Sequence, residues 1–311
     1  MIRLLASELL RARSRRLLWV AVVAIALGIV VGMSIAVANT DRPTQEQLDR
    51  AQRLYERDLR QCLDGQWFPP DEPLPEGYTS LEEFCNDQVT PQSYLSGVME
   101  LSQLPELLRG TSTVVLLLAA LLGASLVGAE WSAGSMATVL AWEPRRIRLF
   151  AVRAAVVVVV AVAMAVFASV LLGLTYRLGV SLKGVTTGAD DWLGQTGGVI
   201  GRIAVLAAIW SLFAYATTMI ARSTAGGLGI LFVELVVIEG FLRGLRPSIE
   251  RWVLVQNATS WVSDQPFAII NQQTRQVISY VSPTAALVTL LVYAGIGLVL
   301  AAAWFRTRDV T

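Results

Sequence analysis

The chain has 311 residues, of which 54% are hydrophobic and 16% charged, and its formal net charge is +1. Soluble domains carry about 25% charged residues, so this composition indicates a membrane protein. The absence of histidine removes the commonest general base and the commonest metal ligand. The sequence also has no Gly-x-x-x-x-Gly-Lys-[Ser/Thr] loop, and its only lysine is Lys183. We therefore expect a membrane protein that is not itself an enzyme.

Six apolar segments are long enough to cross a bilayer, since a spanning helix needs about 20 predominantly apolar residues. An all-α integral membrane protein with six transmembrane helices is therefore expected. The fifth segment is the shortest and contains Glu234 and Glu239. The first is longer than the apolar region of a signal peptide, so we interpret it as an uncleaved anchor. The expected spans are residues 17–38, 111–129, 149–176, 199–221, 226–242 and 283–305.

Arginine sets the expected orientation, because cytoplasmic loops carry an excess of positive charge. With the N-terminus inside, arginines gather in cytoplasmic residues 1–16 and 130–148, with others in the turn 222–225 and the tail 306–311. The opposite face receives residues 39–110, with 14 acidic residues against 6 arginines. Both termini are expected in the cytoplasm, and the near-exclusive use of arginine favours a bacterial plasma membrane.

The segment between the first two spans, residues 39–110, is expected to form a helical extracytoplasmic insert. Residues 45–63 carry apolar side chains at helical spacing. A second helix is expected from near Ser80, with Glu83 placed to complete a capping box. Both cysteines, Cys62 and Cys85, lie in this insert, which favours a disulfide bond over two free thiols.

A short segment, residues 130–148, joins the second and third spans. One continuous helix is expected from Glu130 to Trp142, and Pro144 prevents its continuation. This helix either lies on the membrane as an anchor or presents a face to a soluble partner. The residues that would share one face are Trp131, Ser135, Thr138 and Trp142.

Charged residues within the spans are the next candidates, because an intramembrane charge is costly unless it is paired or hydrated. We expect Glu239 to pair with Arg202 or Arg243, or else to line a substrate path or a dimer interface. Glu234 is expected near mid-membrane, within reach of a translocation path.

The remaining connections are residues 177–198, an external loop, and residues 243–282. Glycines Gly194, Gly197, Gly198 and Gly201 favour close helix packing over a ligand site. Residues 243–282 are too amphipathic to span and too apolar for a free loop. They are expected to form re-entrant or interfacial helices starting near Pro247.

The run from Gly128 to Leu140, with its Glu-x-x-x-Gly-Ser pattern and a following Pro-x-Arg, resembles the membrane subunit of type-2 ABC exporters, the ABC-2 permease family. Six spans, an arginine-rich amphipathic elbow helix at residues 1–16 and the long connection 243–282 also match. The resemblance implies that the helix after the second span is a coupling helix that docks onto a nucleotide-binding subunit. The implied coupling residues are Glu130, Trp131, Gly134, Ser135, Thr138 and Trp142.

The resemblance implies a permease subunit that exports an amphiphile, such as a drug, lipid or peptide. ATP and Mg²⁺ would bind the partner ATPase, with no cofactor in this chain. The implied partners are ABC ATPase subunits, a second copy of the chain or a homologous permease, and membrane lipids, but no nucleic acid. A membrane-anchored sensor with a ligand-binding external domain and a membrane-embedded enzyme are the alternative interpretations.

Overall fold

The structure, a computed structural model, describes residues 2–67, 80–89, 94, 98–184, 192–241, 247–270 and 277–307. Within these ranges, six helices are long and apolar enough to cross a membrane, in agreement with the expected helical multi-pass protein. Several are longer than the expected spans, because hydropathy marks only the apolar part of a helix. The six are Arg16–Ala38, Leu101–Ser132, Arg146–Lys183, Trp192–Ala221, Thr224–Phe241 and Pro283–Thr307.

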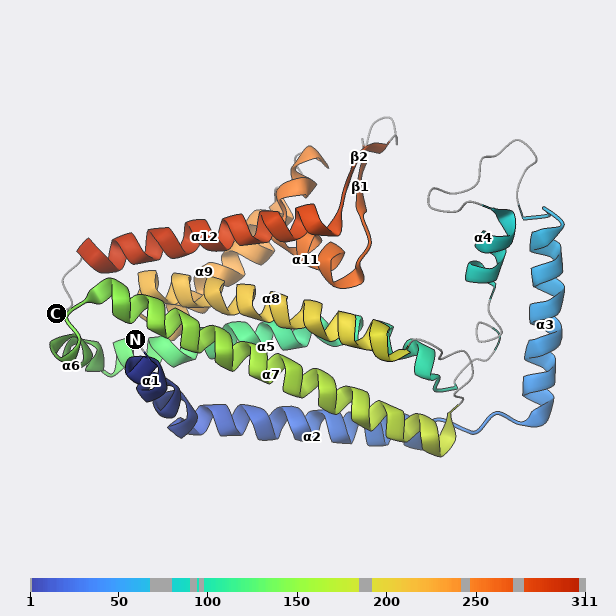
Figure 1. Cartoon of the computed structure of the whole chain (residues 1–311), viewed down its shortest axis with the longest axis horizontal. Coiled ribbons are helices and arrows are strands. Elements are labelled where there is room, and N and C mark those ends of the chain that lie inside the picture. Colours follow the sequence, from blue (N-terminus) through green and yellow to red (C-terminus); the bar gives the residue numbers. More distant parts are fainter. Residues whose placement is uncertain are drawn as a thin grey trace. The chain divides into compact units, whose positions relative to one another are not determined.

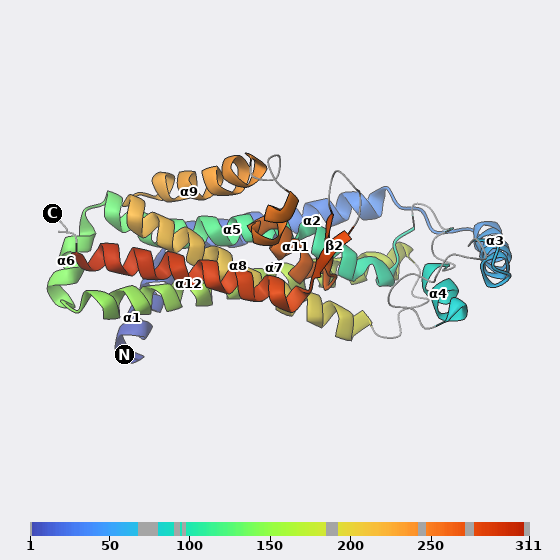
Figure 2. The ribbon, with the colours of Figure 1, turned by 90° about the horizontal axis from the view of Figure 1, so that it is seen from above.

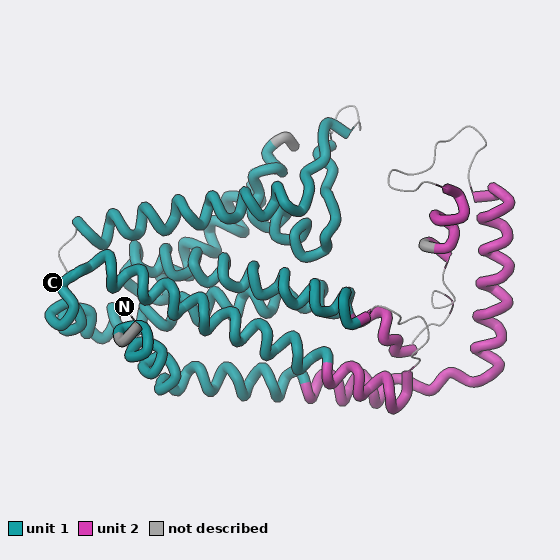
Figure 3. The backbone as a smooth tube through the Cα atoms, viewed as in Figure 1, with its two compact units in different colours: residues 1–29, 105–173, 193–311 teal, residues 30–104, 174–192 magenta. Residues whose placement is uncertain are grey.

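The chain divides into two compact units (Figure 3). Unit 1 comprises residues 1–29, 105–173 and 193–311, and unit 2 comprises residues 30–104 and 174–192. The helices α2 (Arg16–Ala38) and α7 (Arg146–Lys183) contribute to both units.

Unit 1 is a helical bundle with an aromatic core. The Tyr215 side chain is fully buried, and its hydroxyl donates to the carbonyl of Phe150 at 2.9 Å. Phe150 also lies 6.3 Å from Phe305, between ring centroids. The other helices of the unit are α1 (Ile2–Ser14), α5 (Leu104–Ser132), α6 (Ser135–Trp142), α8 (Trp192–Ala221), α9 (Thr224–Phe232), α11 (Leu254–Ser263) and α12 (Pro283–Thr307).

The two ends of unit 1 are built differently (Figures 1 and 2). Helices α1 and α6 and the last turn of α12 lie at one end of the bundle, whereas α11 and the strands lie at the other. The N-terminal helix and the end of α12 therefore share one end with the short helix α6.

Helices α5, α8 and α9 approach one another at glycines. A Cβ added to Gly128 of α5 would lie 2.2 Å from Oγ1 of Thr224, and one added to Gly227 of α9 would lie 2.1 Å from Oγ1 of Thr218. By contrast, a Cβ on Gly197, or on either Gly198 or Gly201, would meet no atom within 4 Å. The expected close packing of the α8 glycines is therefore not made at these three positions within the chain.

The fifth span changes its helical geometry along its length. Ser223 caps α9, its Oγ accepting the backbone N–H of Gly226 at 3.0 Å. After Phe232 the helix continues as a π-helical segment, Val233–Ile238. Glu234 and Glu239 lie within and just after this wider turn.

The connection from the fifth to the sixth span is only partly helical, which departs from the all-α expectation. A 3₁₀ helix (Pro247–Trp252) and α11 are followed by an antiparallel pair of strands, β1 (Phe267–Ile270) and β2 (Val277–Val281). Phe267 pairs with Val281, and both are buried in a cluster with Ala286 of α12. The strand residues are mostly β-branched or aromatic, which favours extended pairing.

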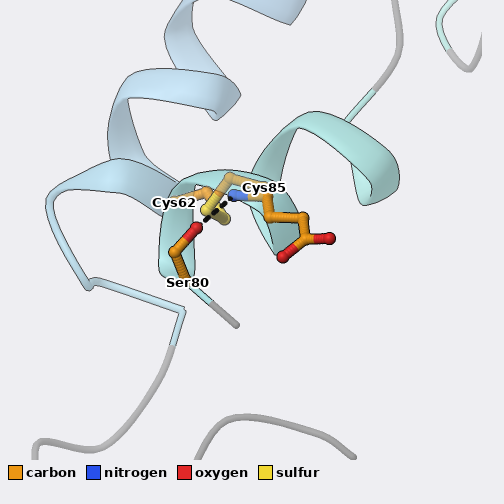
Figure 4. The surroundings of a disulfide bond; sticks show 4 residues. Cys62, Ser80 and Cys85 are labelled. Carbon is orange, nitrogen blue, oxygen red and sulfur yellow. Dashed lines mark hydrogen bonds between the residues drawn. A yellow bond between two sulfur atoms is a disulfide. The ribbon is translucent and has the colours of Figure 1, made fainter. Parts of the chain in front are cut away.

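Unit 2 contains a helical hairpin closed by a disulfide bond (Figure 4). Helix α3 (Gln45–Leu63) has the predicted bounds, and α4 (Leu81–Gln88) follows Ser80, whose Oγ accepts the backbone N–H of Glu83 at 3.1 Å. Cys62 and Cys85 are bonded, with their Cα atoms 5.8 Å apart. Both cysteines are fully buried. A 3₁₀ turn, Leu101–Gln103, precedes α5.

Candidate functional site

The expected coupling helix is two elements, with a turn between them. Helix α5 continues through Glu130 and Trp131 to Ser132, and α6 begins at Ser135. Gly134 separates them with φ +66°, a left-handed conformation that favours glycine. The expectation of one continuous helix over residues 130–142 is therefore wrong, because the glycine ends α5 as a C-terminal cap.

Gly134 is required by the backbone conformation of this turn. A Cβ at this position would meet no atom of the chain within 4 Å, so the glycine does not serve close approach within this chain. Its N–H donates to the carbonyl of Trp131 at 3.1 Å, which closes the end of α5. Its positive φ is what the turn requires.

Glu130 is buried in an ion cluster at the end of α5. Its Oε1 accepts from Nη2 of Arg15 at 2.7 Å, and its Oε2 lies 2.5 Å from Nη2 of Arg153 on α7. Arg15 also donates from Nη1 to the carbonyl of Ser125 at 3.1 Å. Since Glu130 lies in the last turn of α5, it is at the negative end of that helix and not at the start of a coupling helix. The positive charges of Arg15 and Arg153 compensate for the unfavourable interaction between Glu130 and the helix dipole.

Helix α1 joins the same cluster through Glu8. Its carboxylate accepts from Nη1 of Arg11 at 3.1 Å and lies 3.8 Å from Nη2 of Arg153. A cavity of about 20 Å³ lies among these side chains, large enough for about one water molecule. The cluster ties α1, α5 and α7 together within unit 1.

Trp131 and Ser135 also point into the chain. The Trp131 ring lies 6.3 Å from the Phe305 ring in an edge-on arrangement, with the Arg222 guanidinium 5.2 Å from its centroid. Ser135 donates from Oγ to the carbonyl of Glu130 at 3.3 Å. Both residues are partly buried, and their contacts stabilise the turn between α5 and α6.

The exposed face of α6 is formed by Ala137, Thr138, Ala141 and Trp142. We call these four residues the α6 face. Trp142 is 87% exposed, and Met136, on the opposite side, is buried in the core. The α6 face is uncharged and small apart from the tryptophan. Of the six residues expected to form the coupling surface, only Thr138 and Trp142 belong to it.

The structure gives Arg202 a partner other than the expected Glu239, and it places the Glu239 carboxylate at the start of α11. Arg202 forms an ion pair with Asp264, and its carbonyl accepts from Nε1 of Trp261 at 3.2 Å. Glu239 accepts two backbone N–H groups at the start of α11, from Leu254 at 2.5 Å and from Val255 at 3.3 Å. Arg243, the other expected partner of Glu239, lies outside the described residues.

Glu239 therefore acts as a cap for α11. Its carboxylate satisfies two of the four N–H groups that a helix start leaves without intrahelical partners, and the helix dipole favours negative charge there. Glu234 is half-buried and forms no ion pair with any residue in the described ranges. The two acids thus have different surroundings.

An amphipathic cavity of about 360 Å³ lies in unit 1 between α5, α8 and α11. Its polar lining includes Glu106 and Arg109, whose side chains pair at 3.1 Å, together with Thr113. Its apolar lining includes Leu206 and Trp210 of α8. This volume is within the range of small-molecule sites, which run from about 300 to 1,000 Å³.

The hairpin of unit 2 carries a small polar network around Asp58. The hydroxyl of Tyr94 donates to Oδ2 of Asp58 at 2.8 Å, and Nε of Arg57 lies 2.8 Å from Oδ1. The Arg57 guanidinium, followed by the Tyr94 hydroxyl, lowers the pKa of Asp58. Burial, followed by the hydrogen bond to Asp58, raises the pKa of Tyr94 to about 12. Neither shift moves a pKa toward neutrality, which favours a structural role for this network.

Glu130 is the one member of the ion cluster that was among the expected site residues, and the sequence holds a signal for two of the others, Glu8 and Arg153. Glu8 lies three residues after Leu5 and four before Ala12, and Ala12 is buried. An acid on the apolar face of an otherwise arginine-rich helix is the signal that could have indicated a buried partner. Arg153, four residues beyond the start of the third expected span, is a comparable signal on α7.

No family model, curated protein sequence or solved structure matches this chain.

Proposed function

We propose that the chain is the permease subunit of an ATP-driven exporter of the ABC-2 type. The observation that carries this proposal is the α6 face, an uncharged exposed surface with Trp142 at its end, on a short helix between two membrane spans. Large aromatic residues dominate the energetics of protein interfaces. This face would dock onto a soluble ATPase, which binds ATP and Mg²⁺.

The connections of α6 support mechanical coupling. Two residues separate α5 from α6, and three separate α6 from α7. The ion pairs of Glu130 with Arg15 and Arg153 tie the end of α5 to α7 and to the chain before α2. A displacement of α6 by the ATPase would therefore reorient these helices together, without a flexible linker to absorb it.

The orientation that this function requires agrees with the arrangement of unit 1. Helices α1 and α6 and the end of α12 share one end of the bundle, which we assign to the cytoplasm (Figure 1). The end with α11 and the strands would then face outward. The arginine-rich segments support this orientation, because positive charge favours the cytoplasmic side.

The cavity between α5, α8 and α11 supports an amphiphilic substrate. It offers the Glu106–Arg109 pair at one part of its lining and Trp210 at another. A ligand with both polar and apolar parts could contact the polar lining with one part and the apolar lining with the other. A second copy of the chain, or a homologous permease, would complete the path across the membrane.

Co-purification tests this function. The tagged chain extracted from its own membranes in mild detergent is expected to bring down a soluble protein with a P-loop. Thr138→Arg, on the α6 face, is expected to reduce that capture more than tenfold, because an unpaired charge in an interface core costs at least about 2 kcal/mol. Export in reconstituted vesicles should fall with it.

Thr307→Arg is the matched control, since Thr307 is also exposed and ends α12 at the same end of unit 1. This variant is expected to retain the ATPase. Failure of the wild-type chain to capture any P-loop protein would overturn the proposal and favour the membrane-anchored sensor. Full capture by Thr138→Arg would show that the α6 face is not the docking surface.

A further inference from the structure

A groove of about 380 Å³ lies beside the first turn of α2, against α5. It is separate from the α6 face and from the amphipathic cavity. Four of its eight lining residues are leucines, which we call its walls together with Ser125 and Ala129. We call its two arginines, which lie where α2 begins, its rim. The lining residues that matter here are Arg15, Arg16, Leu18, Leu122, Leu126 and Ala129.

The walls of this groove suit a hydrocarbon chain. Ser125 is its one polar wall residue, and the Ser125 hydroxyl already donates to the carbonyl of Leu122 at 3.2 Å. The carbonyl of Ser125 accepts from Arg15. Both groups are thus engaged, and the remaining wall offers no hydrogen-bonding partner for water. In a bilayer such a groove is filled by lipid chains, since water there would lose hydrogen bonds.

The rim of the groove carries net positive charge. Arg15 is held in place by Glu130 and by the carbonyl of Ser125. Arg16 is exposed and forms no ion pair with any residue that the structure describes. The nearby acids, Glu8 and Glu130, both face the buried cluster and are already paired. The rim therefore has a free guanidinium, whose planar donors match a phosphate.

The groove starts at the polar end of the spans and descends a short way. Arg16 is the first residue of α2, and the α5 lining runs from Ala129 to Leu122, which is about 10 Å along a helix. A phosphate at Arg16 would therefore lie at the headgroup level with its acyl chain along α5. Free phosphate would contact only the arginines at the rim, and an uncharged lipid would contact only the apolar walls.

We propose that this groove binds one phospholipid with a net negative headgroup, held by Arg16 at the phosphate and by the leucine walls at the acyl chain. Charge complementarity at the rim selects the anionic lipid over a zwitterionic one. The bound lipid lies directly beside the Arg15–Glu130 pair, so it stabilises the junction between α1, α2 and α5. This inference requires no ATPase and stands independently of the exporter assignment.

Native mass spectrometry of the full chain in detergent tests the site, with phosphatidylglycerol and phosphatidylcholine of identical acyl chains as probes. The wild type is expected to bind one phosphatidylglycerol at least about fivefold more tightly than phosphatidylcholine, the effect of about one basic residue near an anionic headgroup. Arg16→Gln should remove this preference. Ala129→Trp, which fills the groove, should weaken the binding of both lipids.

Arg145→Gln is the control, because it removes one exposed arginine from a different element. It is expected to bind both lipids as the wild type does. The proposal is overturned if the wild type binds the two lipids equally. It is also overturned if Arg145→Gln loses as much of the preference for phosphatidylglycerol as Arg16→Gln does. Displacement of the lipid by soluble glycerol phosphate would also overturn it, since that result assigns binding to the rim alone.

Discussion

Arg15 donates from Nη2 to Oε1 of Glu130 at 2.7 Å, and so joins the residue before α2 to the last turn of α5. The other oxygen of Glu130 faces Arg153 of α7, and the Glu130 residue is only 8% exposed. The acid that closes the second span is thus committed to partners within its own chain. A partner protein would be held by the α6 face, and Glu130 would keep α6 in position.

Removing the charge of Glu130 is expected to destabilise unit 1. Glu130→Gln would leave Arg153, a 4% exposed residue, without its closest carboxylate. Breaking a buried ion pair on one side costs about 3 kcal/mol. The remaining carboxylate near Arg153, that of Glu8, lies farther away, at 3.8 Å, and would compensate only part of the buried charge. Thermal unfolding of the protein in detergent should show a clear drop in melting temperature.

Glu143→Gln is the control for this variant. Glu143 pairs with Arg148 at 3.7 Å, and that arginine side chain is 33% exposed. Partly exposed ion pairs contribute about 1 kcal/mol or less. A melting temperature for Glu130→Gln no lower than that of Glu143→Gln would contradict the structural role of the cluster.

Glu239 and Glu234 are expected to respond differently to the same substitution. Glu239→Gln keeps the size of the side chain but removes the charge that accepts the N–H groups of Leu254 and Val255. Hydrogen bonds to charged groups contribute about 1.5–3 kcal/mol, so the melting temperature should fall. Glu234→Gln should leave it nearly unchanged. Equal effects of the two variants would argue against the cap.

Local sequence patterns predicted the parts of this fold that depend on neighbouring residues. Helix α3 has its predicted bounds because its apolar residues are helically spaced, and the capping box of Thr44 and Gln47 could have been recognised in addition. The pairing of Cys62 with Cys85 followed from their isolation in one segment. The six apolar helices followed from hydropathy alone.

Long-range pairing was the part that the sequence did not determine. Charge and depth made Arg202 a plausible partner for Glu239, but Asp264 lies closer because α11 ends beside α8. Asp264 has φ +59°, and an aspartate that ends a helix in this conformation cannot be recognised from charge pattern. Similarly, Glu130 was assigned to a surface because its three-dimensional neighbours, Arg15 and Arg153, are distant in sequence.

The contact between α9 and α8 predicts opposite effects for two glycines of the same helix. Gly227→Ala would place its Cβ 2.6 Å from the Cα of Thr218, so the helices must separate, at about 1–3 kcal/mol. The Cβ added by Gly229→Ala would meet no atom within 4 Å, so this substitution should stabilise the helix by about 0.5–1 kcal/mol. Melting temperatures of the two variants in detergent provide the comparison. Equal shifts would show that the close approach is not made in solution.

The disulfide predicts a redox-dependent hairpin in unit 2. Closing a loop of 23 residues is expected to stabilise the hairpin by about 3 kcal/mol, mainly by restricting the unfolded chain. Cys62→Ser together with Cys85→Ser should make trypsin cleave after Arg57 and Arg60 of α3 much faster. The transmembrane helices should keep their melting temperature. Non-reducing mass spectrometry that finds both wild-type cysteines freely alkylated would contradict the bond.

Gly134 supports the turn that presents α6, and its substitution is expected to act through the backbone. With φ +66°, Gly134→Ala should cost about 1–2 kcal/mol, since a Cβ is disfavoured in the left-handed region. Relief of this strain is expected to rotate α6, so capture of the proposed ATPase should fall. Capture by Gly134→Asn should fall less, because asparagine adopts this conformation more readily than alanine.

Gly65→Ala is the matched control for the turn. Gly65 has φ +73°, and a Cβ there meets no atom within 4 Å, so the backbone strain is the same as at Gly134. It lies in unit 2, after α3, and its substitution should lower stability without changing ATPase capture. Capture that is retained in Gly134→Ala, or lost equally in Gly65→Ala, would show that the orientation of α6 does not govern binding. We expect capture of the ATPase to be highest with glycine at position 134, lower with asparagine and lowest with alanine, and to be unchanged in Gly65→Ala. This result would identify the left-handed turn as the element that presents the α6 face.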